Sequence, residues 1–125
     1  MEARKNDIRP ELLAALIFVE SSFHPNVVSS ANACGLTQVI PKWTGGRETK
    51  GKKYTCDQLK DPKTSISVGA QILSYNTKVY AEGNRDKGLC FYNAGTKCIT
   101  KKGFYKRLGY VKKVRRIYNI LIGGC

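Results

Sequence analysis

Glu20 is the residue in this chain whose type and setting are best suited to chemistry. It stands near the end of an almost wholly apolar stretch, residues 12–19. At helical spacing it shares a face with Leu13, Leu16 and Ile17. An apolar setting penalises the ionised carboxylate, so it raises the pKa and can hold a proton on the acid near neutral pH, as a general acid requires. The alternative is a helix-end acid facing solvent, and Glu20 alone does not decide between them.

Two long helices are predicted to position this part of the chain. Pro10 suits the first turn of a helix and Pro25 breaks one, so a helix is predicted from about residue 10 to residue 22. Asp61 stands before a proline and predicts an N-cap for a second helix. The positions at helical spacing on the second helix are Ile66, Gly69, Ile72, Leu73, Asn76, Val79 and Tyr80.

The remaining segments predict shorter or more irregular structure. A short helix is expected from about Arg85 to Tyr92, with Gly95 available for a left-handed cap. Residues 27–41 are expected to be irregular, with a turn or short helix near Gly35 to Pro41. Residues 42–60 are expected to form a long loop with at most a small β-hairpin or sheet. The predicted fold class is therefore mainly α.

Length and composition predict one ordinary folded domain. The chain has 125 residues, of which 42% are hydrophobic and 25% are charged, so a single compact domain over 1–125 is expected, as a monomer. No apolar run approaches the ~20 residues of a membrane span, so no span is predicted. No signal peptide is evident after Met1.

The net charge of +13, with 22 Lys and Arg, favours polyanionic partners: nucleic acid, anionic membrane or acidic cell wall. A last helix is predicted over 103–121. Its apolar arc is Phe104, Leu108, Val111, Val114, Tyr118 and Leu121, with Arg107 the odd residue within it. The residues mostly opposite are Lys106, Lys112, Lys113, Arg115 and Arg116. They are interpreted as a solvated face. Aromatic residues do not interleave with this basic run, so no specific nucleic-acid partner is predicted.

The five cysteines predict disulfides rather than a metal site. No pair has C-x-x-C spacing and the chain has one histidine, so no metal and no cofactor are expected. The favoured pairs are Cys34–Cys56 and Cys90–Cys98, because each closes a glycine-containing loop, with Cys125 left free. Other pairings remain open, as do buried reduced thiols in a cytosolic protein.

Several short strings follow one another along the chain. They are Glu20-Ser21-Ser22-Phe23-His24-Pro25, Ala33-Cys34-Gly35-Leu36-Thr37-Gln38, Asp61-Pro62 through Gly69 and Leu73, Phe91-Tyr92-Asn93-Ala94-Gly95, and Tyr110-Val111. In this order and spacing, the chain resembles the catalytic domain of the soluble lytic transglycosylases, which is also similar to goose-type lysozyme. The resemblance covers about residues 8 to 120 and implies a lysozyme-like α+β fold. Thr37 departs from the family pattern, which has Met there.

The resemblance implies cleavage of the β-1,4 bond between N-acetylmuramic acid and N-acetylglucosamine in peptidoglycan. Glu20 would be the sole catalytic carboxylate, acting first as acid and then as base, with 1,6-anhydromuramic products; no obvious second acid stands out in the sequence. The alternatives are a muramidase that uses water and a non-catalytic wall-binding module. The expected partners are peptidoglycan glycan strands and anionic wall polymers. The expected location is extracytoplasmic: periplasmic, secreted or in a phage virion.

The resemblance also favours Ser21, Gln38, Tyr92 and Asn93 as substrate-binding residues. Ser21 would bond Glu20 or the sugar, or else end its helix. Gln38 would bind the N-acetyl or peptide portion, or be satisfied within its loop. Tyr92 would orient the acid or the leaving sugar, or pack in the core, and Asn93 would contact sugar or form a turn. Trp43 would either stack on a sugar ring or pack in the core.

Overall fold

The two long helices form where their start signals predict them. α2 (Pro10–Ser21) begins with its proline in the first turn. α4 (Pro62–Tyr75) begins after Asp61, whose carboxylate accepts a hydrogen bond from the backbone N–H of Thr64 at 3.0 Å. Both predicted helices are therefore confirmed in the computed structural model, which describes residues 2–98 and 108–123.

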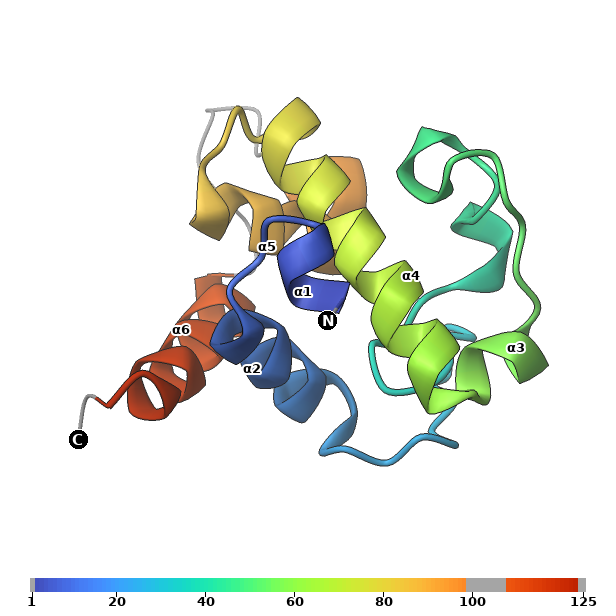
Figure 1. Ribbon diagram of the computed structural model, residues 1–125, viewed down its shortest axis with the longest axis horizontal. Coiled ribbons are helices and arrows are strands. Elements are labelled where there is room, and N and C mark those ends of the chain that lie inside the picture. Colours follow the sequence, from blue (N-terminus) through green and yellow to red (C-terminus); the bar gives the residue numbers. More distant parts are fainter. Residues whose placement is uncertain (1, 99–107, 124–125) are drawn as a thin grey trace.

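Shorter elements connect and flank these two helices. The other α-helices of the described residues are α1 (Glu2–Lys5), α3 (Cys56–Lys60), α5 (Arg85–Ala94) and α6 (Leu108–Leu121). Tight helical turns form η1 (Pro41–Trp43), η2 (Arg47–Thr49) and η4 (Gly95–Cys98), and a π-helical turn, η3 (Asn76–Tyr80), extends α4. α4 crosses the molecule, with α2 and α6 side by side toward one end and the chain around α3 toward the other (Figure 1). No helix in the described part of the chain is long and apolar enough to cross a membrane.

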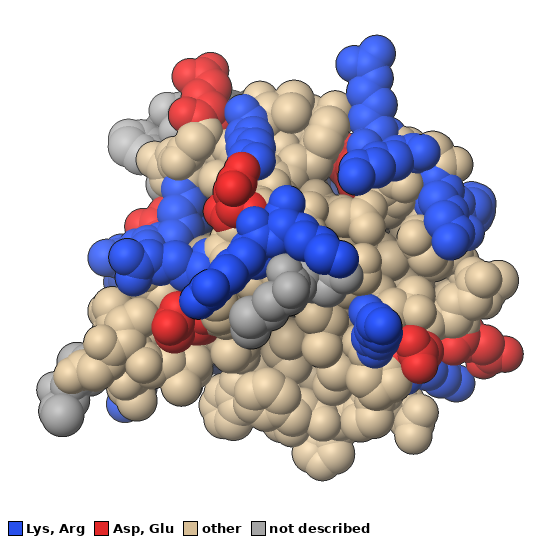
Figure 2. Space-filling model, in the orientation of Figure 1, with Lys and Arg blue, Asp and Glu red and all other residues tan. Residues whose placement is uncertain are grey.

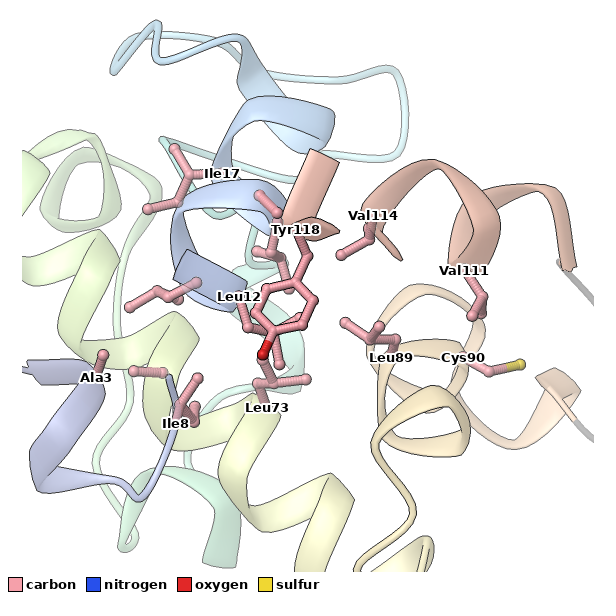
Figure 3. Packing of buried hydrophobic residues seen from close by; sticks show 14 of the residues in the cluster. Ala3, Ile8, Leu12, Ile17, Leu73, Leu89, Cys90, Val111, Val114 and Tyr118 are labelled. Atoms are coloured by element: carbon pink, nitrogen blue, oxygen red, sulfur yellow. The ribbon is translucent and has the colours of Figure 1, made fainter. Parts of the chain in front are cut away.

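The core lies where four helices converge. Leu12 of α2, Leu73 of α4, Leu89 of α5, and Val114 and Tyr118 of α6 are all buried in one cluster (Figure 3). Full burial of one such side chain is worth about 1.5–3 kcal/mol relative to exposure. This packing fixes α2 against α6, so it sets where the C-terminal end of α2 points.

α6 confirms part of its predicted pattern. Val111, Val114 and Tyr118 are buried, but Leu121 is 47% exposed, so the apolar arc ends one turn earlier than predicted. The predicted start of this helix near Gly103, with Phe104, Lys106 and Arg107, lies outside the described residues. The basic side chains of α6 that the structure describes are exposed: Lys112, Lys113, Arg115 and Arg116.

On the face shown in Figure 2, the surface charge is distributed rather than confined to one block. On the face in Figure 2, Lys and Arg side chains are spread widely, with Asp and Glu side chains among them. On α6, Arg115 pairs with Asp86 of α5 at 3.3 Å. The exposed basic residues of α6 therefore form a solvated face, as predicted, and one of them also ties two helices together.

Residues 42–60 differ from the predicted loop with a weak hairpin. The segment holds η2 and α3, and no strand forms among its residues. α3 begins with a capping box, in which the Thr55 hydroxyl accepts from the Gln58 N–H and the Gln58 side chain accepts from the Thr55 N–H. The β-bridges of the described residues lie earlier, at Val28–Cys34 and Cys34–Val39.

Both favoured disulfides are confirmed, Cys34–Cys56 and Cys90–Cys98. The first ties the bridge segment to the start of α3, and the second ties α5 to the end of η4. Cys125 lies outside the described residues. Two disulfides in so small a domain are typical of a protein that works in an oxidising environment.

Removing the longer-range disulfide should be the costlier of the two deletions. The bond Cys34–Cys56 spans 22 residues, and its replacement by two alanines should lower the free energy of unfolding by about 3 kcal/mol. Cys90–Cys98 spans 8 residues and should be worth slightly less. Urea unfolding of the two double variants measures both effects. An unfolding midpoint that reductant leaves unchanged would contradict this expectation.

Candidate active site

A cavity of about 490 Å³ is lined by residues that lie between Glu20 and Gly95 in the sequence. Glu20 contributes from the end of α2, and Gln38 and Trp43 contribute from the segment that follows it. Asn76 lies at the end of α4, and Tyr92 lies on α5. Aliphatic and aromatic side chains accompany these polar groups, as is usual in a cleft that binds an organic ligand.

Glu20 is partly buried on the wall of this cavity and has one hydrogen-bond donor. The Tyr110 hydroxyl of α6 donates to Glu20 Oε2 at 2.8 Å. Burial raises the pKa of Glu20 from 4.5 to about 7, and the hydrogen bond from Tyr110 opposes part of that rise. Near neutral pH the carboxyl group can therefore either give or accept a proton.

Two tyrosines flank this acid from different helices. The Tyr92 hydroxyl donates to the Thr37 carbonyl at 2.6 Å, which joins α5 to the 35–38 turn. Burial raises the pKa of Tyr92 and of Tyr110, and the Glu20 charge raises both further. Both phenols therefore stay protonated near neutral pH and act as hydrogen-bond donors.

Ser21 is not among the residues that line the cavity. It is buried, and its hydroxyl lies 2.8 Å from the Leu36 carbonyl and 3.1 Å from the Ile17 carbonyl. The contact with the Ile17 carbonyl is the helix-end role that the sequence suggested for Ser21. The contact with the Leu36 carbonyl fixes the end of α2 to the turn that contains Leu36. This placement favours positioning of Glu20 over direct contact with a ligand.

Gln38 lines the cavity from a turn that its own side chain stabilises. The residue has a φ of 54°, and its Nε2 donates to the Val27 and Gly35 carbonyls at 3.0 and 2.9 Å. These two bonds fix the orientation of the amide. Oε1 has no bond to another described residue and remains available to accept one from a ligand.

Asn93 and Trp43 also line the cavity. Asn93 is exposed at the end of α5, where its amide is accessible to a ligand. Trp43 is 58% exposed, so it does not pack in the core, which was one of the two roles suggested for it. The structure thus brings together Glu20, Gln38, Tyr92 and Asn93, and it places Ser21 behind them.

The cavity also holds residues that the sequence patterns did not assign to it. The chief ones are Glu48 on η2 and Asn76 and Tyr80 on η3, with Tyr110 behind Glu20. The expectation that no second acid stands near the site needs correction, because Glu48 lines the same cavity. The two causes of the Glu20 pKa shift are burial, which raises it, and the Tyr110 hydrogen bond, which lowers it. Among the described residues, no cluster of three or more His, Cys, Asp or Glu side chains could hold a metal ion.

A mainly helical domain with a protonatable acid at a helix end on the wall of a cleft defines the lysozyme-like class. Within it, the chain belongs to the transglycosylase SLT domain family, which its sequence matches over residues 1–110. It is 30% identical, over 126 aligned residues, to membrane-bound lytic murein transglycosylase C of Actinobacillus pleuropneumoniae. That alignment covers 92% of this chain and 34% of the relative, so the chain spans about a third of the relative's length.

Solved structures share the fold. The lytic transglycosylase Slt of Pseudomonas aeruginosa, solved as an inactive mutant, superposes with a TM-score of 0.79 at 22% identity, over 98% of this chain and 23% of that one. The 70 kDa soluble lytic transglycosylase of Escherichia coli gives a TM-score of 0.75 at 25% identity, over 98% and 24%. These matches confirm the predicted fold class, and the match to the family model confirms the predicted family.

Proposed function

We propose that residues 1–125 form a single catalytic domain that cleaves the β-1,4 bond between N-acetylmuramic acid and N-acetylglucosamine in peptidoglycan. The observation that carries this proposal is Glu20, partly buried on the cavity wall with a pKa raised to about 7. Membership of the transglycosylase SLT domain family supports the same reaction class. The names of the relatives, lytic murein transglycosylases, support peptidoglycan as the substrate.

Glu20 would act twice in this reaction. Its protonated form gives a proton to the glycosidic oxygen as the C1–O bond breaks, and the muramic acid ring gains oxocarbenium character. The substrate's own N-acetyl group can stabilise that cation. The Glu20 carboxylate then accepts the proton of the C6 hydroxyl while the C6 oxygen bonds to C1, which closes a 1,6-anhydro ring and restores the acid.

The residues around Glu20 would divide the remaining work. Tyr110 holds the carboxyl group through its 2.8 Å hydrogen bond, and Ser21 anchors the helix end that carries it. Gln38 would accept a hydrogen bond from the N-acetyl or peptide portion through Oε1. Tyr92 and Asn93 would contact the sugar from α5.

A hydrolytic muramidase is the second candidate, and Glu48 is the observation that favours it. A second carboxylate in the same cavity could activate a water molecule, as in glycosidases that use two acids. A wall-binding module without activity is disfavoured, because binding alone does not need a carboxyl group with a pKa of about 7.

Mass analysis of the products from purified peptidoglycan tests the proposal. Anhydro ends, one water lighter than reducing ends, support the transglycosylase reaction. Reducing ends that carry oxygen from labelled water would instead support the muramidase. Release of no soluble fragments by the folded protein would overturn both enzymatic readings.

Tyr110→Phe should shift the pH profile of cleavage. The hydroxyl stabilises the ionised form of Glu20, so its removal raises the pKa of that acid further. The alkaline limb of kcat/KM, where the proton donor is lost, should move up by about one pH unit, because a hydrogen bond to a charged group is worth about 1.5–3 kcal/mol. A limb that stays in place or moves to lower pH would contradict this role for Tyr110.

The two disulfides support an extracytoplasmic site of action, where peptidoglycan lies. The net charge of +13 would favour contact with anionic wall polymers. We propose further that the protein acts outside the cytoplasm and as a monomer.

A further inference from the structure

Glu48 is a carboxylate without a cationic partner among the described residues of a strongly basic protein. It lies on η2, lines the cavity, and forms no ion pair with another described residue, although the chain carries 22 Lys and Arg. Its one hydrogen-bond partner among the described side chains is the Tyr80 hydroxyl, which donates to Oε1 at 3.3 Å. Gly46 leaves room for this arrangement, because a Cβ there would lie 2.6 Å from Glu48 Oε2.

Asn76 places a second polar group on the wall of the same cavity. The side chain is 92% buried (8% exposed), yet its amide has no hydrogen bond to another described residue. No polar side-chain atom that is fully buried in the described structure lacks a hydrogen-bond partner, so the amide atoms of Asn76 are accessible from the cavity, where a ligand can bind them. The residue opens the π-helical turn η3, a rare element that is frequent at functional sites.

Tyr80 completes the wall with an aromatic face. It is 48% exposed, and it ends η3 four positions after Asn76, close to one full turn of a π-helix. Asn76 and Tyr80 therefore lie on the same side of η3, and both line the cavity. A carboxylate, an amide oxygen and an aromatic ring on one cavity wall form a site suited to an ammonium group.

We infer that Glu48, Asn76 and Tyr80 form a subsite for a primary ammonium group on the substrate. The carboxylate supplies the opposite charge, the Asn76 oxygen accepts an N–H, and the Tyr80 ring provides a cation–π contact. A de-N-acetylated amino sugar or the free side-chain amine of a stem peptide carries such a group. The inference rests on the proposed function, since it adds a preference within the same cavity.

Calorimetric binding to the Glu20→Gln protein tests the subsite without turnover. The ligands are a β-1,4-linked glucosamine tetramer and its fully N-acetylated counterpart. Glu48→Gln in that background should weaken binding of the amine-bearing tetramer by about tenfold or more, because it removes a hydrogen bond between charged groups. Binding of the acetylated tetramer should change little.

A second pair of ligands distinguishes the source of the amine. It consists of a muropeptide with a free side-chain amine on its stem peptide and the same muropeptide after N-acetylation. A Glu48 effect confined to the sugar pair assigns the amine to the glycan, and an effect confined to the muropeptide pair assigns it to the peptide. Equal effects on amine and acetylated forms in both pairs would overturn the subsite.

Two further variants guard against indirect effects. Asp57→Asn removes the same charge from a side chain that is 96% exposed and outside the cavity, so it should leave both affinities unchanged. Asn76→Leu should weaken amine binding without lowering the melting temperature, because it deletes no hydrogen bond to the described protein. If Asp57→Asn matched Glu48→Gln, a general charge effect would replace the inference. None of these outcomes depends on which products the active enzyme releases.

Discussion

Replacing Glu20 with Gln should lower the rate of peptidoglycan cleavage by about 10²–10⁴-fold, the usual contribution of a general acid–base group. Glutamine keeps the size of the side chain, but it can neither give a proton to the glycosidic oxygen nor accept one from the C6 hydroxyl. Release of soluble fragments from purified peptidoglycan measures the effect. Glu11→Gln, on the same helix but outside the cavity, is the matched control and should retain full activity.

The same substitution should stabilise the protein at alkaline pH. The pKa of Glu20 is about 7 in the folded protein and ordinarily 4.5, so the folded state holds a proton that the unfolded chain releases between these values. Wild-type stability therefore falls as pH rises from about 4.5 to 7, by an amount on the order of 3 kcal/mol, and the Glu20→Gln variant is free of that loss. Urea unfolding should show little difference at pH 4 and a more stable variant at pH 8. A variant that is both active and no more stable at pH 8 would show that Glu20 is not the catalytic acid.

Gly35→Ala should destabilise the whole domain by about 3–5 kcal/mol, because strain and overpacking add at this position. The residue has a φ of 82°, which L side chains rarely adopt, and an added Cβ would lie 1.9 Å from the Leu59 carbonyl oxygen. The Gly35 carbonyl also accepts hydrogen bonds from both the backbone N–H and the side-chain amide of Gln38. The substitution should therefore disturb the cavity as well as the fold, and the melting temperature and cleavage rate should fall together.

Gly51 provides the matched control for this expectation. It has nearly the same backbone angle, a φ of 80°, but nothing lies within 4 Å of an added Cβ. Gly51→Ala should therefore cost only the conformational strain, about 1–2 kcal/mol. If the two variants lost equal stability, the close contact with Leu59 would not be the cause at Gly35.

Local signals are enough to predict much of the helical frame. Pro10 and Asp61 mark the starts of α2 and α4, and Gly95 marks the end of α5. Gly95 has a positive φ of 59°, but its ψ of −142° is not the left-handed helical conformation predicted for this cap. α3 is not predicted, although its capping-box residues, Thr55 and Gln58, stand at the right spacing. α3 has five residues, too few to show a hydrophobic periodicity, so its capping box is the sequence signal that indicates it.

The far wall of the cavity is harder to predict, because its residues meet only in the folded chain. Tyr110 reaches Glu20 across 90 positions, and nothing local to either residue indicates that hydrogen bond. Glu48 sits in a polar loop segment and has no distinguishing signal. Asn76 does have a distinguishing signal, because it is a polar residue at a position of the helix where the pattern is apolar. Its place on the cavity wall explains why a polar side chain stands there.

The sequence motifs shared with the family place Glu20 correctly on a cavity. They do not tell which neighbouring residues of the motifs also line that cavity. Ser21 follows the acid directly, yet its hydroxyl is directed to the Leu36 carbonyl, because successive residues on a helix point about 100° apart. Gln38 does line the cavity, since the turn around Gly35 brings it there. Adjacency in sequence is therefore a weaker guide to the site than the arrangement of the turns.

The most direct test of the central claim is the titration of the Glu20 carboxyl group in the free protein. Carbon-13 NMR of protein labelled at glutamate side chains follows each carboxyl carbon with pH, and the signal missing from Glu20→Gln assigns the resonance. The structure predicts a midpoint of about 7, which suits one group that first gives and then accepts a proton. A midpoint near the ordinary value of 4.5 would contradict the account, because Glu20 would then hold too little proton at neutral pH to serve as the acid.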